Sequence, residues 1–166
     1  MIIDTNVIVT VDVDHPNAAP HCVLRCLEVL RTARAETIAL DVGGEIVGEY
    51  SRNVTGGVYP LSVGAQFVRE LLNTQYDQSR CELVEITAHP ARVFEEFPDD
   101  PRLASFDRSD RKFVAVSIAS KNSHEIYNAV DTDWAAIDEV LAEFDVNVVY
   151  LCPSFTSPPP RVAPAG

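Results

Sequence analysis

Apolar residues recur at helical spacing in several parts of the chain. Val23, Leu27 and Leu30 share one face of the stretch from about 20 to 35, and charged residues occupy other positions, so we expect an amphipathic helix there. Comparable spacing predicts four further helices, at about 44–54, 62–75, 109–121 and 134–144. A shorter helix is expected at 89–97, ended by Pro98.

Short runs rich in Val, Ile and Leu separate these helices and have the character of strands. They lie at 1–3, 37–41, 81–86, 125–130 and 146–151. Strands that alternate with helices predict an α/β domain whose parallel sheet is covered on both faces. The apolar run 7–11 fits either a short helix or a continued first strand.

We expect one domain, residues 1–152, because 166 residues suffice for one sizeable core. Residues 153–166 carry five prolines and no periodicity, so they are expected to form a flexible tail. The chain has no apolar run of membrane-spanning length and no signal-peptide pattern, which predicts a cytoplasmic protein with no membrane partner.

The four cysteines fit the same compartment, because no two of them form a Cys-x-x-Cys pair. Cys22 and Cys26 lie four apart in a predicted helix, next to His21. This group is too small for a structural zinc site, which needs four ligands. We therefore expect reduced, buried thiols.

The net charge of −12, from 13 basic and 25 acidic residues, is unusual for a nucleic-acid-binding protein. Such proteins normally carry a basic surface that neutralises phosphates. Clustered carboxylates that bind divalent cations would reverse the local sign, and so would a local basic patch.

Acidic residues stand at places where the predicted strands and helices begin or end. Asp4 and Asp131 each follow a predicted parallel strand, so both should emerge at one edge of the sheet. Asp110 opens a buried helix, where an N-cap is the alternative interpretation. Asp131 or Asp133 would equally serve as a helix cap, and Glu49 taken alone fits a solvated helix position.

Several carboxylates at one sheet edge repel one another, and each loses solvation. A fold tolerates such a cluster when it usually binds a cation. Mg²⁺ favours a few carboxylates together with waters and phosphate oxygens, and metal ions bound in this way assist phosphodiester cleavage.

Four segments, in this order, resemble motifs of the PIN-domain nucleases, which include the VapC-type toxins. They are Ile2–Asn6, Glu49–Tyr50, Asp107–Ala115 and Val130–Trp134, and the resemblance extends over about residues 1–151. It implies a three-layer α/β/α fold with a five-stranded parallel sheet. It also implies an endoribonuclease that needs Mg²⁺ or Mn²⁺ and acts on RNA. A toxin–antitoxin pair, with an antitoxin-like protein inhibitor, and a homodimer are further implications.

The resemblance also assigns roles to individual residues. The acidic quartet would be Asp4, Glu49, Asp110 and Asp131. Asp133 would be an auxiliary acid that positions water or metal, and Thr5 or Asn6 would orient Asp4. Glu45 competes for the second position, but Glu49 is favoured because the adjacent Tyr50 on the buried face would anchor it. The segment 88–107 matches nothing in the resemblance.

Four basic residues near these acids are candidates for holding substrate phosphates. They are Arg52, Arg108, Arg111 and Lys112. The alternative interpretation is that they balance the charge of the crowded acids.

Two other functions compete with the nuclease. A PIN-like interaction module that does not cleave would account for the strongly acidic balance. A phosphotransfer domain of receiver or phosphatase type also places an Asp after its first strand. It needs a further acid two residues on, where this chain has Asn6.

Overall fold

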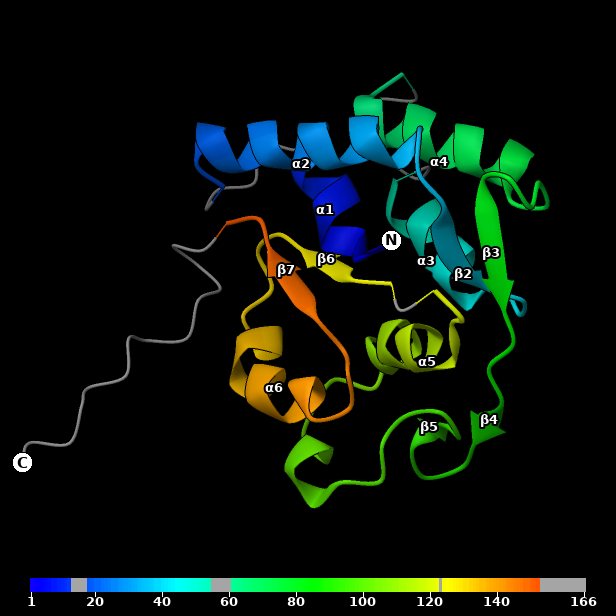
Figure 1. Ribbon diagram of the computed structural model, residues 1–166. Coiled ribbons are helices and arrows are strands. Elements are labelled where there is room, and N and C mark those ends of the chain that lie inside the picture. The colour runs from blue at the N-terminus through cyan, green and yellow to red at the C-terminus, as the bar shows by residue number, and fades with distance from the viewer. Residues whose placement is uncertain (13–17, 55–60, 123, 153–166) are drawn as a thin grey trace, which may run out of the picture.

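The computed structural model describes residues 1–12, 18–54, 61–122 and 124–152 (Figure 1). Strands and helices alternate along these ranges, which confirms the α/β class. The helices are α1 (Thr5–Thr10), α2 (Pro20–Ala33), α3 (Glu45–Val54), α4 (Val63–Thr74), α5 (Arg111–Ala119) and α6 (Asp133–Ala142), with a 3-10 turn at Pro101–Leu103. The strands are β1 (Ile2–Ile3), β2 (Ile38–Asp41), β3 (Cys81–Val84), β4 (Ala88–His89), β5 (Val93–Phe94), β6 (Ile126–Asn128) and β7 (Val148–Tyr150).

The tail expected at 153–166 lies outside the described residues. Within the part that is described, no helix has both the length and the apolar character to cross a membrane.

The parallel strands form two ladders where the sequence predicted one sheet of five. β1, β6 and β7 pair in the order β1-β6-β7, and β2 pairs with β3. One backbone hydrogen bond joins the two ladders, from Ala39 N to Met1 O at 2.9 Å. The pairing between β1 and β2 does not extend further, because β1 has only two residues and Asp4 then caps α1.

The prediction of a helix at 89–97 is wrong. β4 and β5 form an antiparallel hairpin in which His89 lies opposite Val93. The ring nitrogen Nδ1 of His89 accepts hydrogen bonds from the backbone N–H groups of Ala91 at 3.2 Å and Arg92 at 3.0 Å. These bonds close a tight turn after Pro90, so the backbone donors that a helix would use are already satisfied.

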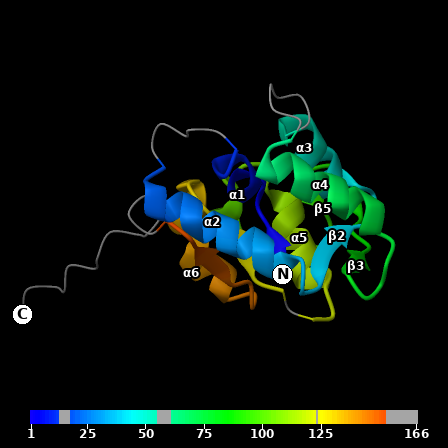
Figure 2. The same cartoon turned by 90° about the horizontal axis from the view of Figure 1, so that it is seen from above.

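The helices lie on two sides of the strands. In Figure 1, α2 and α4 run along one side with α1 and α3 beneath them, and α5 and α6 lie on the other side. Figure 2 views the same arrangement from above, with α2 and α4 towards the viewer. The undecided run 7–11 lies mostly in α1, which packs against both α2 and α3.

An aromatic cluster fixes the segment 94–107, which is part of the stretch 88–107 that the resemblance left unmatched. The ring of Phe106 meets Trp134 edge-on with centroids 4.9 Å apart, and Phe97 stacks on Phe106. Trp134 is fully buried. The segment therefore covers α5 and α6 and contributes to the core that holds Trp134 in place.

The cysteines differ from the expectation of reduced thiols. Cys22 on α2 and Cys152 after β7 form a disulfide, while Cys26 and Cys81 are free and buried. Cys22 and Cys152 are 130 residues apart in the sequence. Their pairing depends on where β7 ends against α2, which spacing along the sequence does not reveal.

Candidate functional site

Asp4 stands at the junction between β1 and α1 and is almost entirely buried. One of its carboxylate oxygens, Oδ1, accepts the backbone N–H of Asn6 at 3.0 Å and so caps α1. The other, Oδ2, accepts the indole N–H of Trp134 at 2.9 Å. Asp4 thus has a structural role as an N-cap, and Trp134 in the core fixes its second oxygen.

Asn128 at the end of β6 connects the loop around Asp131 to α1. Its Oδ1 accepts a hydrogen bond from the side-chain amide of Asn6 at 2.8 Å and another from Asp131 N at 3.2 Å. Its amide group donates to Asp131 O at 2.7 Å. Asn128 is fully buried, so this network sets how Asp131 lies relative to Asp4.

Glu49 of α3 faces the same region, whereas the side chain of Glu45 is exposed. Thr5 Oγ1 donates a short hydrogen bond to the carboxylate of Glu49. Lys112 Nζ forms a 2.5 Å ion pair with the same carboxylate and also donates to Ser109 O. As the sequence analysis anticipated, Tyr50 is buried, and its hydroxyl donates to Ile3 O, next to Asp4.

Asp110 precedes α5, but its side chain makes no capping hydrogen bond to the helix. The N-cap interpretation is therefore not supported for its carboxylate. Asp131, in contrast, accepts the backbone N–H of Asp133 at 2.9 Å, at the start of α6. The N-cap residue of α6 is Thr132, so neither Asp131 nor Asp133 is the cap that the alternative interpretation expected. Asp131 nevertheless accepts the first backbone N–H of the helix.

The pKa values of three acids are raised together. Burial raises the pKa of Asp4 to about 8, and the charges of Asp110 and Asp131 add to the rise. Burial, followed by the charge of Asp131, raises the pKa of Asp110 to about 7, although the Lys112 ammonium opposes it. Burial also raises the pKa of Asp131, with a further contribution from Asp133. These carboxyls, distant in sequence, are close enough to repel one another.

A pocket opens beside this cluster between α1, α3 and the loop after β6. Its lining residues are Asp4, Thr5, Asn6, Val9, Thr10, Glu49, Asn53, Val130 and Asp131. The hydroxyl of Thr10 is buried and has no hydrogen-bond partner among the described residues. Thr10 thus lines the pocket while its hydroxyl oxygen is buried behind the pocket surface without a partner among these residues.

The four basic candidates have different surroundings. Lys112 contacts Glu49, as described above, and Arg52 is exposed on α3. Arg108 donates to Ala91 O at 2.9 Å and lines another pocket, near the β4–β5 hairpin. The guanidinium of Arg111 is buried, donates to backbone carbonyls that include Ala104 O at 2.9 Å, and lies over the Phe97 ring. The donors of Arg111 are thus used in holding the 94–107 segment.

The distances between the acids bear on metal binding. Among the residues that the structure describes, three metal-ligating side-chain atoms lie within 4.8 Å of one another only at Cys22, Cys26 and Cys152. The oxygens of the acidic quartet do not converge that tightly. Asp133 is mostly exposed and enters the site through its backbone N–H and its charge.

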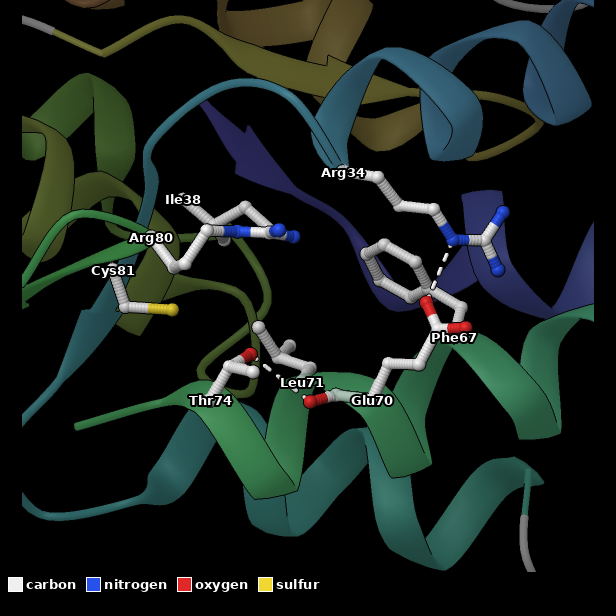
Figure 3. A pocket seen from close by; sticks show the side chains of 8 residues that line it. All are labelled: Arg34, Ile38, Phe67, Glu70, Leu71, Thr74, Arg80 and Cys81. Carbon is white, nitrogen blue, oxygen red and sulfur yellow. Dashed lines mark hydrogen bonds and ion pairs between the residues drawn. The ribbon is translucent and has the colours of Figure 1, made fainter. Parts of the chain in front are cut away.

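A smaller hollow lies at the start of β2 and β3, against α4 (Figure 3). Arg34 and Glu70 close it with a 2.6 Å ion pair, above the apolar side chains of Phe67 and Leu71. Its volume of about 10 Å³ holds no more than about one water molecule. It offers no space for a substrate.

Three residues of the site were not singled out in the sequence. Asn128 appeared as one polar position in a strand, Trp134 as an apolar marker of a helix, and Thr10 as part of an undecided run. A buried Asn that ends a strand three residues before an Asp is a signal that sequence reasoning can use, because it must satisfy its amide locally. The contact of Trp134 with Asp4 spans 130 residues and has no local signal.

Comparison of the chain with protein-family models, with curated proteins and with solved structures finds no match.

Proposed function

We propose that this chain is a PIN-like endoribonuclease that needs Mg²⁺ or Mn²⁺ and hydrolyses RNA phosphodiesters. The observation that supports it best is the group of Asp4, Asp110 and Asp131, of which Asp4 and Asp131 line a pocket. Burial raises the pKa of all three; the charges of Asp110 and Asp131 add to the rise at Asp4, and the charge of Asp131 adds to the rise at Asp110. Perturbed acids that line a pocket are typical of functional sites. A divalent cation would offset the repulsion among these carboxylates when they are ionised.

The chemistry of the donor set fits such a cation. The acidic residues Asp4, Asp131 and Glu49 line the pocket, and Mg²⁺ and Mn²⁺ favour oxygen ligands with several retained waters. Retained waters would fill the space that the acids leave between them. When bound, the cation would supply the charge that activates water and stabilises the leaving oxygen.

The chain's own residues would prepare this site. Trp134 and the backbone N–H of Asn6 hold the Asp4 carboxylate in one orientation. Thr5 and Lys112 do the same for Glu49. Of the four basic candidates, Lys112 is buried and pairs with Glu49, so it would balance the charge of that acid. The exposed Arg52, on the same helix as Glu49, would be the candidate open to a substrate phosphate.

The arrangement of strands is compatible with the same proposal. The bond from Ala39 N to Met1 O lies between the β2-β3 and β1-β6-β7 ladders, and a continuous sheet across it would have the order β3-β2-β1-β6-β7. Helices on both sides of these strands would complete a three-layer α/β/α fold with five parallel strands (Figure 1). A single-stranded or looped RNA substrate, an antitoxin-like inhibitor and a homodimer rest on the resemblance alone.

A non-catalytic PIN-like interaction module is the second candidate. The pairing of Lys112 with Glu49 favours it, because the ammonium already neutralises one acid of the quartet. The wide spacing of the other acids among the described residues favours it as well. Calorimetry with Mn²⁺ separates the two candidates, since a folded protein that binds no Mn²⁺ would be the interaction module.

The direct test is cleavage of a long structured RNA by wild-type protein with Mn²⁺, by wild-type protein with EDTA, and by Asp4→Asn and Asp110→Asn variants with Mn²⁺. We expect cleavage only by the wild type with Mn²⁺, and rates at least ~10²-fold lower for each variant. Glu45→Gln is the matched control, because its carboxylate is exposed on the same helix as Glu49. Variants that cleave as fast as wild type would refute the nuclease.

A further inference from the structure

The disulfide between Cys22 and Cys152 lies close to the scaffold of the acidic site. Both sulfurs are fully buried between α2 and the end of β7. Next to Cys152, the backbone N–H of Leu151 donates to Asn128 O at 2.9 Å. The guanidinium of Arg25, on α2, donates to Leu151 O at 3.3 Å. The disulfide therefore fixes the chain one residue away from its hydrogen bond to Asn128.

Asn128 carries this constraint into the site. Its side chain bonds both to Asn6, two residues after Asp4, and to the backbone of Asp131. The path from the disulfide to the acids is thus a short series of covalent and hydrogen bonds. Leu151 and Asn128 thus connect Cys152 to Asp131.

We propose that the Cys22–Cys152 disulfide is a redox switch for the acidic site: it holds β7 against α2 when oxidised and releases it when reduced. In the released form, the bond from Leu151 to Asn128 opens more often, and the loop around Asp131 loses its fixed geometry. This inference rests on the proposed function as far as it concerns metal binding.

The third thiol keeps the pairing fixed. The Sγ of Cys26 lies within 4.8 Å of both disulfide sulfurs. Burial raises the pKa of Cys26 to about 12, so at neutral pH it stays a protonated thiol and does not attack the disulfide. The switch therefore has two states, Cys22–Cys152 bonded or both reduced, and Cys26 takes no part in either.

The two states are prepared from the full-length protein. Tris(carboxyethyl)phosphine breaks the S–S bond, takes its oxygen from water as the phosphine oxide, and leaves Cys22 and Cys152 each with a proton. Oxidised glutathione restores the bond and leaves as two molecules of reduced glutathione. Each reagent is removed by gel filtration before measurement.

Two measurements test the switch. We expect reduction to weaken the calorimetric affinity for Mn²⁺ by roughly fivefold or more. We also expect it to speed amide hydrogen exchange at Leu151 and Asp131, compared with Ile38 on the far ladder. Exchange at Asp131 that does not change on reduction would overturn the proposal. This measurement needs no catalysis, so it decides the coupling even if the nuclease proposal fails.

Serine variants sharpen the result. Cys22→Ser and Cys152→Ser should behave as the reduced form under both conditions, whereas Cys26→Ser and Cys81→Ser should keep the redox response. Cys81 is the matched control because it is a free, buried cysteine on β3. Loss of the response in Cys26→Ser would contradict the assigned pairing. Tight Zn²⁺ binding by the reduced wild type that protects all three thiols would overturn the proposal, because the group would then be a metal site.

Discussion

Two acids at opposite ends of the strands, the buried Asp4 and the partly buried Glu82, have opposite pKa shifts. Asp4 follows β1, and burial together with two neighbouring acids raises its pKa to about 8. Glu82 lies near the start of β3. Burial alone would raise its pKa, but hydrogen bonds from Asn122, the backbone N–H of Lys121, His124 and Ser120 lower it to about 2. The protein thus satisfies the charge of Glu82 internally.

The difference lies in the number of donors and in the sign of the neighbouring charges. Glu82 accepts bonds at 2.6 Å from Asn122, 2.7 Å from His124 and 3.0 Å from Ser120. Asp4 accepts two hydrogen bonds among the described residues and faces other carboxyls. A buried acid with enough donors is a structural element, whereas one surrounded by acids needs a cation from outside. This contrast distinguishes the candidate site from an ordinary polar network.

The largest expected effect is a change of stability with pH and metal. The pKa of Asp4 is about 8 in the folded protein and near 4 in an unfolded chain, so between these values the folded state binds the extra proton. Stability of the metal-free protein should therefore fall as the pH rises from about 4 to 8. Mn²⁺ at about 100 times its Kd should restore ~2.7 kcal/mol at pH 8. Denaturant unfolding with Mn²⁺ and with EDTA measures both.

Asp4→Asn is the matched variant for this experiment, since it cannot ionise at that position. It should lose much of the fall with pH and most of the Mn²⁺ effect. The charge of Glu82 has the opposite dependence: its lowered pKa stabilises the fold above about pH 4.5, and that contribution is lost as the pH falls towards 2. Equal Mn²⁺ stabilisation of wild type and Asp4→Asn would show that the cation binds elsewhere.

Most of the fold could be predicted from the sequence because it depends on local periodicity. Five of the six α-helices in the described ranges follow from apolar spacing, and the alternation with strands gives the α/β class. The hairpin at 88–94 could not be predicted, because it depends on the His89 ring accepting backbone donors. The disulfide of Cys22 with Cys152 required the position of β7 against α2.

In the candidate site, too, some features could be predicted from the sequence and others could not. Parallel strands predicted that Asp4 and Asp131 would emerge together, and their coupled charges agree with that. The structural role of the Arg111 guanidinium could not be predicted, because the carbonyl groups to which it donates lie in the 94–107 segment and on the hairpin. Nor did the sequence reveal that Lys112 pairs with Glu49 across 63 residues. Sequence periodicity predicts where helices and strands form, whereas these side-chain contacts depend on how the layers pack.

The second-largest expected effect is a difference in folding stability between variants of Glu82 and of Asp4. Glu82→Gln should lower the free energy of unfolding by about 1–3 kcal/mol at neutral pH, because the new amide group faces donors that lose their acceptor. Asp4→Asn should cost less at pH 8. It removes a repelling charge and keeps an acceptor for the α1 cap, so that one donor, the indole N–H of Trp134, loses its acceptor, against several donors at Glu82. Urea unfolding of both variants without metal gives the comparison. A greater loss for Asp4→Asn would mean that its carboxylate is held mainly as a cap.

The smallest expected effect is that of Ser120→Ala. The Ser120 hydroxyl donates to Glu82 at 3.0 Å and accepts the backbone N–H of Asn122 at 3.1 Å. Its loss should lower the free energy of unfolding by about 0.5–1.5 kcal/mol and raise the pKa of Glu82 only slightly, because Asn122, Lys121 and His124 still donate. Urea unfolding at pH 3 and pH 7 measures both quantities. A rise of the Glu82 pKa to its ordinary value would mean that one hydroxyl, and not the number of donors, keeps this acid charged, and the contrast with Asp4 would then rest on neighbouring charges alone.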